Sequence, residues 1–202
     1  MSDVKAAVDL EHLHAERRWE ELATQVVARY GPEVLGFLHT LARDDADASD
    51  AFAQACEDLW KSLPSLELRA SHRTWFYTLA RHAFFRIRRS PAIRRREGLS
   101  AISEIADPTR SQTAPHLRSE VKEGVAVIRA ELSEEDRALL VLRVDRGMAW
   151  TEIARILFGV REIEGQRARV TARLRKRFQL IKDMIRERAA QLGLAGVADE
   201  RR

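Results

Sequence analysis

Hydrophobic residues recur every three or four positions along most of the chain, a spacing typical of α-helices with one buried face. We expect helices over residues 4–30, 34–42, 46–61, 73–88, 117–132, 134–146, 152–157 and 161–191. Gly31 and Pro32 are expected to separate the first two helices, because proline is well placed at a helix start. Ser133 and Thr151 are the expected N-caps of two later helices, and Gly159 is expected to form a turn.

The composition favours an all-α protein. Only 9 glycines and 5 prolines occur in 202 residues, so few positions interrupt helical patterns. Three of those prolines and a glycine fall within residues 91–115, where the apolar pattern dissolves, and this stretch predicts a flexible linker. We therefore expect two small helical domains. The predicted division is an extension over 1–22, a domain over 23–90, a linker over 91–115, a helix-turn-helix domain over 116–192 and a tail over 193–202.

Charge changes the picture, because it is unevenly distributed. The net charge is only +4, yet residues 69–96 contain nine arginines and no acid, whereas residues 44–58 contain six acids and no base. Such polarisation indicates one anionic partner and another that is not. The basic stretch also carries five aromatic rings, and arginines interleaved with aromatic side chains suit the phosphates and unpaired bases of nucleic acid. The alternatives are a solvated basic helix with its aromatic residues in the core, and a solvated acidic face.

Several classes of protein are not expected. Cys56 is the only cysteine, so the chain has no internal disulfide and no cysteine-rich zinc site. The six histidines are scattered and no carboxylate cluster of metal-site type accompanies them. We expect no catalytic residues, metal or cofactor. The sequence shows no signal-peptide pattern and no apolar run long enough for a bilayer, so we expect a cytoplasmic protein without membrane insertion.

Two separated segments together resemble a known family. The first includes residues 30–34 (YGPEV), residues 47–60 (DASDAFAQACEDLW) and residues 73–82 (RTWFYTLARH). The second is residues 132–157 (LSEEDRALLVLRVDRGMAWTEIARIL). In this order they resemble region two and region four of a bacterial RNA polymerase sigma factor of the small, two-domain extracytoplasmic-function type. The resemblance covers much of the chain and implies that it directs core polymerase to promoters.

The family's roles carry over to particular positions. Its acidic helix docks on the clamp helices of the largest polymerase subunit, which implies a docking face of Asp47, Asp50, Gln54, Glu57 and Asp58. Its region-two loop and basic helix capture and open the −10 element. Here that implies the loop 62–72 and the side chains Arg69, Ser71, Arg73, Trp75, Tyr77, Arg81, His82 and Arg86.

The second domain of such proteins binds the flap of the second-largest subunit and reads the −35 element. The resemblance implies DNA contacts from Thr151, Arg167, Arg169, Arg173 and Lys176. The segment after Gly159 departs from the family pattern by extra residues and by Gly165. Many relatives are held by an anti-sigma factor, and the tails 1–20 and 193–202 either bind such a partner or have no role.

Two other functions stay open. A stand-alone helix-turn-helix regulator would bind duplex DNA tightly without polymerase, whereas a sigma factor of this kind binds promoters poorly alone. A nucleic-acid enzyme is the third hypothesis, and the scattered histidines argue against it.

Overall fold

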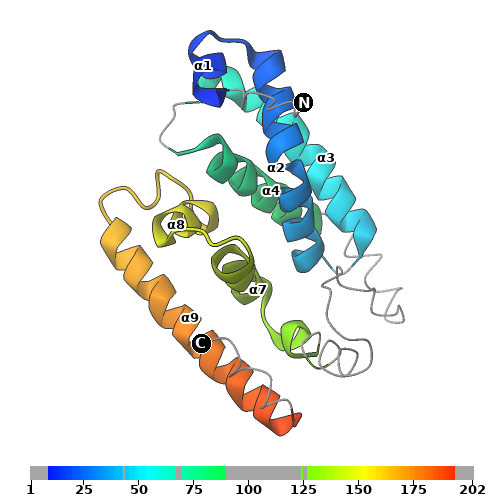
Figure 1. The fold of residues 1–202 in the computed structure, drawn as a ribbon, viewed down its shortest axis with the longest axis vertical. Coiled ribbons are helices and arrows are strands. Elements are labelled where there is room, and N and C mark those ends of the chain that lie inside the picture. The colour runs from blue at the N-terminus through cyan, green and yellow to red at the C-terminus, as the bar shows by residue number, and fades with distance from the viewer. Residues whose placement is uncertain (1–8, 43, 67–69, 90–123, 125–126, 194–202) are drawn as a thin grey trace, which may run out of the picture. The chain divides into compact units, whose positions relative to one another are not determined.

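The computed structural model describes residues 9–42, 44–66, 70–89, 124 and 127–193, and their regular secondary structure is helical throughout (Figure 1). The predicted all-α fold is therefore confirmed for these residues. The chain divides into two compact units, one comprising residues 1–101 and 154–164, the other residues 102–153 and 165–202. The predicted linker over 91–115 lies outside the described residues, and the predicted domain boundaries stay predictions.

The first unit begins with a short helix, α1 (Leu10–Ala15), which is capped by Asp9 through a 2.9 Å hydrogen bond from the backbone N–H of Glu11. Leu10 and Leu13 are buried. The prediction of one continuous helix over residues 4–30 is wrong, because the chain turns between α1 and α2. Arg17 takes a left-handed conformation there, with φ of 57°.

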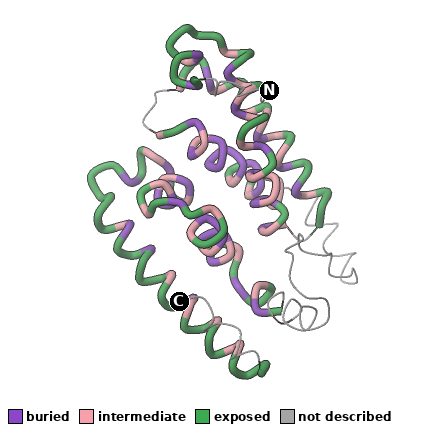
Figure 2. Tube along the Cα trace, in the orientation of Figure 1, coloured by how far each residue is buried: buried purple, intermediate pink, exposed green. Residues whose placement is uncertain are grey.

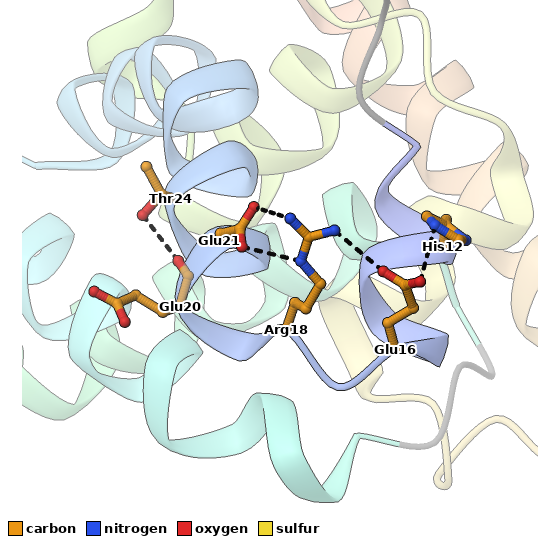
Figure 3. Close-up of polar contacts among 6 residues, drawn as sticks. All are labelled: His12, Glu16, Arg18, Glu20, Glu21 and Thr24. Atoms are coloured by element: carbon orange, nitrogen blue, oxygen red, sulfur yellow. Dashed lines mark hydrogen bonds and ion pairs between the residues drawn. The ribbon is translucent and has the colours of Figure 1, made fainter.

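Arg18 holds this turn together. Its Nε donates to Glu21 at 3.0 Å and its Nη1 to Glu16 at 3.1 Å (Figure 3). The pair of acids on either side raises the pKa of the guanidinium, the hydrogen bond to Glu21 contributing most. His12 contacts Glu16 at 3.2 Å from the far side, so α1 and the start of α2 are joined by a short series of polar contacts.

α2 (Trp19–Leu41) runs straight through the expected break at Gly31 and Pro32. A proline inside a helix removes one backbone hydrogen bond and normally kinks or ends it. Packing outweighs that loss here, because Val34, Phe37 and other residues on both sides of Pro32 are fully buried. Gly31 is also buried, and a Cβ atom there would lie 3.4 Å from the ring of Phe52. This is an ordinary contact distance, so the helix packing would also accommodate a small side chain at this position.

α3 (Asp45–Ser62) and α4 (His72–Arg88) are the other two long helices of the first unit, with the short 3₁₀ helix η1 (Leu63–Ser65) following α3. Each long helix has a side-chain cap: Asp44 accepts from the N–H of Asp47 at 2.7 Å, and Ser71 from that of Thr74 at 3.2 Å. α4 packs against both α2 and α3. Its buried positions therefore cover most of its circumference, including Thr74 and Thr78, and not only the apolar stripe that the spacing predicts.

The second unit contains α7 (Glu134–Leu140), which continues into a single turn of π-helix, η2 (Val141–Asp145). Ser133 caps α7 by accepting the N–H of Asp136 at 3.2 Å, as predicted. The predicted cap of α8 (Trp150–Phe158) is wrong, because Thr151 lies inside the first turn. The N–H of Ala149 is instead satisfied by the side chain of Glu152 at 3.1 Å.

The last helix, α9 (Arg167–Gln191), begins six residues later than predicted. Residues 160–166 form turns. Gly159 and Gly165 have φ angles of 91° and 77°, a region that glycine adopts without steric cost and that ends a helical path. The apolar period continues through this segment in the sequence, but two left-handed residues prevent a helix from following it.

Charged and aromatic pairs hold α9 to the rest of the second unit. Arg177 makes a two-pronged ion pair with Asp136, one contact of which is 2.7 Å, and Arg188 makes another with Glu131 at 2.7 Å. The rings of Trp150 and Phe178 meet edge to face at 5.6 Å. Figure 2 shows that most of α9 is exposed, and its buried side chains are Thr171, Leu174 and Ile181.

Candidate nucleic-acid and protein-docking surfaces

Tyr77 of α4 belongs to the core. Its side chain is fully buried, and its ring meets the ring of Phe37 at 5.2 Å in an edge-on arrangement. Its hydroxyl donates to the backbone carbonyl of Glu33 at 3.3 Å. The expected −10 contact by Tyr77 is incompatible with this burial, because the residue lies on the side of α4 that packs against α2.

Arg73 is also engaged within the protein. Its Nε and Nη2 donate to the two carboxylate oxygens of Glu33 at 2.7 and 2.8 Å, and both side chains are largely buried. A bidentate pair of this kind fixes orientation as well as charge. Arg73 therefore fastens the start of α4 to α2. Sequence reasoning missed Glu33 because 40 residues separate it from Arg73, beyond the reach of any spacing rule.

Three further −10 candidates contribute to the structure as well. The Nε1 of half-buried Trp75 donates to Ser62 Oγ at 3.0 Å, which ties α4 to the end of α3. Ser71 is exposed, but its hydroxyl caps α4. The guanidinium of Arg81 lies 4.7 Å from the centroid of the Phe85 ring, a cation–π contact. These positions combine support of α4 with partial exposure.

The remaining −10 candidates differ in their surroundings. His82 and Arg86 are exposed. Arg69 lies outside the described residues. Arg86 reaches across to α3, where its Nη2 lies 2.8 Å from Asp58 Oδ2. The structure thus joins a predicted DNA contact to a predicted docking residue.

The five docking candidates lie on α3, on the sides that the helix does not bury. Asp50 and Glu57 are exposed, and Asp47, Gln54 and Asp58 are half-buried. The Nε2 of Gln54 donates to Glu57 at 3.0 Å and to Asp58 at 3.2 Å. Glu57 also accepts from Lys61, and this hydrogen bond is the main reason that the pKa of Glu57 is lowered. The acidic face therefore includes a hydrogen-bonded cluster.

The −35 candidates are all exposed. Arg169, Arg173 and Lys176 share one face of α9, and Arg167 stands at its first turn. Thr151 is exposed in the first turn of α8. The segment between α8 and α9 covers residues 159–166, whereas a helix-turn-helix usually has a turn of about 3–4 residues. A turn does follow α8 at Gly159 as predicted, but it is longer than the tight turn expected of a helix-turn-helix.

A pair of histidines that the sequence did not suggest joins α1 to α4. His14 Nδ1 and His72 Nε2 lie 3.3 Å apart, and their rings are 5.4 Å apart. Trp19 packs edge-on against His14 at 5.2 Å. Burial, and then the proximity of His14, lowers the pKa of His72. The two rings share one hydrogen bond only while at least one of them is neutral.

We expect acid to destabilise the first unit through this pair. The folded-state pKa of His72 lies below its unfolded value of about 6.5, so protonation favours the unfolded state. The contribution is fully present above about pH 6.5 and is lost as the pH falls towards the folded pKa. Urea unfolding between pH 7.5 and 5 measures this loss, and His72→Gln should flatten the profile. Equal slopes for wild type and His72→Gln would contradict the assignment.

Within the described ranges, no three side chains of the His, Cys, Asp and Glu types gather closely enough to hold a metal ion. In the same parts of the chain, no helix combines the length and apolar character that crossing a bilayer requires. Burial raises the pKa of the Cys56 thiol.

Residues 26–96 match the family model of Sigma-70 region 2. The chain therefore contains a region 2 domain, and α3, η1, α4 and most of α2 lie inside it. The docking and −10 candidates all fall within the match, whereas α1, α7, η2, α8 and α9 lie outside it.

Among solved structures, the chain is similar to the sigma factor RpoE from Bartonella quintana, which was crystallised in complex with the anti-sigma factor NepR. The sequences are 18% identical, the TM-score is 0.54, and the alignment covers 79% of this chain and 96% of that one. The likeness shows a shared fold. No curated protein matches the sequence significantly. Together, the region 2 domain and the shared fold support a sigma factor.

Proposed function

We propose that this protein is an alternative sigma factor of the extracytoplasmic-function type, acting in the cytoplasm. The observation that carries the proposal is the arrangement of the region 2 domain, in which an acidic docking helix and a basic, aromatic helix pack directly against each other. A protein partner on α3 and promoter DNA beside α4 can then be held by one rigid body. Binding supplies the free energy for opening DNA, and the chain performs no covalent chemistry.

Core RNA polymerase is the proposed protein partner. The exposed carboxylate of Asp50 and the cluster around Gln54 suit the basic side chains and hydrogen-bond donors of a helical partner. We assign this surface to the clamp helices of the largest subunit, and the second unit to the flap of the second-largest subunit. An anti-sigma factor is a further proposed partner, supported by the complex in which the Bartonella quintana protein was crystallised.

Promoter DNA is the proposed nucleic-acid partner. In the region 2 domain we retain Arg81, His82 and half-buried Trp75 as −10 contacts, together with Ser71 and Arg69. In the second unit the exposed cationic face of α9 supports a −35 contact by Arg169, Arg173 and Lys176, with Arg167 and Thr151 beside it.

Asp50→Arg combined with Gln54→Ala tests the proposal. We expect at least about a tenfold loss of affinity for purified core polymerase, because a reversed charge meets the same partner surface. Fluorescence anisotropy of labelled chain measures the affinity. Glu20→Arg with Gln25→Ala makes the same changes on α2, outside the region 2 match, and should bind core normally.

The proposal fails if both double variants bind core equally well and no promoter responds to the wild-type protein. Sequencing of RNA from cells that overproduce the chain supplies the promoters for that comparison. A tight, sequence-specific gel shift by the chain without polymerase would instead favour the stand-alone helix-turn-helix regulator.

A further inference from the structure

A network of hydrogen-bonded side chains runs from α4 to α3. Arg86 donates to one oxygen of Asp58 at 2.8 Å, and Gln54 donates to the other oxygen at 3.2 Å. Gln54 also donates to Glu57 at 3.0 Å, and Glu57 accepts from Lys61. Among these five residues, Arg86 is the sole member from α4. The network therefore depends on α4 at one end.

The side-chain amide of Gln54 can take only one orientation in this network. Its neighbours are carboxylates, which accept hydrogen bonds and donate none, so only the NH₂ group of the amide can face them. Both N–H groups of Gln54 are used, one for Asp58 and one for Glu57. The position of Asp58 therefore determines how Gln54 presents its amide on the docking face, and Arg86 determines the position of Asp58.

The charges in this side-chain network argue against a DNA contact by Arg86. Glu57 and Asp58 carry two negative charges, and Lys61 and Arg86 carry two positive charges, so the cluster is neutral. A phosphate approaching Arg86 would also meet the carboxylate of Asp58, and turning the guanidinium towards the phosphate would weaken the hydrogen bond that holds Asp58. Asp58 is the more buried partner, with 22% of its side chain exposed against 56% for Arg86. Losing the cation therefore costs more than breaking a fully exposed pair.

We propose that Arg86 is a positioning residue of the docking face, which orders Asp58 and Gln54 for core polymerase, and that it does not contact promoter DNA. This inference rests on the proposed function. It assigns Arg86 to a different partner from the one that the family resemblance implies.

Arg86→Gln tests the inference when core binding is measured without DNA. We expect about a two- to fivefold loss of core affinity, the size that a partly exposed ion pair supports. Arg86→Lys keeps the charge and should restore binding to within about twofold. Arg89→Gln removes the same charge from the end of the same helix and should leave core affinity unchanged.

A double-mutant cycle shows whether Arg86 acts through Asp58. Asp58→Asn should weaken core binding to a similar degree, and Asp58→Asn with Arg86→Gln should be no weaker than the worse single variant. With the holoenzyme, Arg86→Gln should leave the salt dependence of promoter binding unchanged, since no phosphate contact is lost.

The opposite pattern overturns the inference. Unchanged core affinity for Arg86→Gln, with a salt slope reduced by about one, would place Arg86 on DNA. Additive losses in the cycle would show that Arg86 acts independently of Asp58. Absence of core binding by the wild-type chain would refute the proposed function itself and this inference with it, so the two failures are distinguishable.

Discussion

Replacing Tyr77 with alanine is expected to destabilise the first unit by about 3–5 kcal/mol, the range for removing a large buried aromatic side chain. The ring is fully buried against Phe37, so its loss leaves a cavity in the core. Urea unfolding followed by tryptophan fluorescence measures the change. Trp19, Trp60 and Trp75 lie in this unit, and Trp150→Phe removes the signal of the fourth tryptophan.

Tyr77→Phe provides the matched control. It keeps the ring and removes only the hydroxyl that donates to the carbonyl of Glu33 at 3.3 Å. We expect a loss of about 1 kcal/mol or less, typical of a single hydrogen bond. If Tyr77→Ala unfolded like wild type and failed only in opening promoters, Tyr77 would be a DNA contact and its burial in the free protein would not matter.

Glu33→Arg is expected to destabilise the first unit by about 2–3 kcal/mol. Two guanidinium groups would then face each other at a largely buried position where a bidentate pair now stands. Exposed ion pairs contribute about 0–1 kcal/mol and breaking buried ones costs about 3–5 kcal/mol, so a partly buried pair lies between. The same fluorescence assay measures the effect.

The charge swap separates structure from DNA binding. Glu33→Arg with Arg73→Glu restores an ion pair between α2 and α4, and we expect it to recover at least half of the lost stability. The swapped chain carries an acid at position 73, so unchanged promoter opening would show that Arg73 serves the fold alone. A swap that recovers no stability would show that this pair does not determine how α4 docks.

Sequence periodicity located α3 and α4 well because each has a side-chain cap and an apolar stripe, although the burial of α4 extends beyond its stripe. It predicted α2 poorly because Gly31 and Pro32 are visible in the sequence as helix breakers. The packing of Phe52 and Phe37, which favours a continuous helix, is not visible there. The start of α9 was missed for the opposite reason. There the apolar period continues, and the left-handed glycines at 159 and 165 decide the outcome locally.

The candidate surfaces also combine features that the sequence shows locally with contacts that only the fold creates. Composition located the acidic and basic helices correctly, because charge runs along each helix are visible in the sequence. It did not show which charges pair between helices. Arg73 with Glu33, Arg86 with Asp58 and His72 with His14 are separated by 40, 28 and 58 residues, so only the fold brings each pair together.

The arginine pairs that fasten α9 affect how DNA binding by this helix would respond to salt. Arg188 meets Glu131 at an exposed site, where added ions screen the attraction, whereas Asp136 is buried and its pair with Arg177 is better protected. Raising the salt concentration would therefore loosen one end of α9 within the protein while it weakens contacts to phosphates. A count of phosphate contacts taken from the salt slope alone would then be too high, because part of that slope would report the attachment of the helix to its own domain.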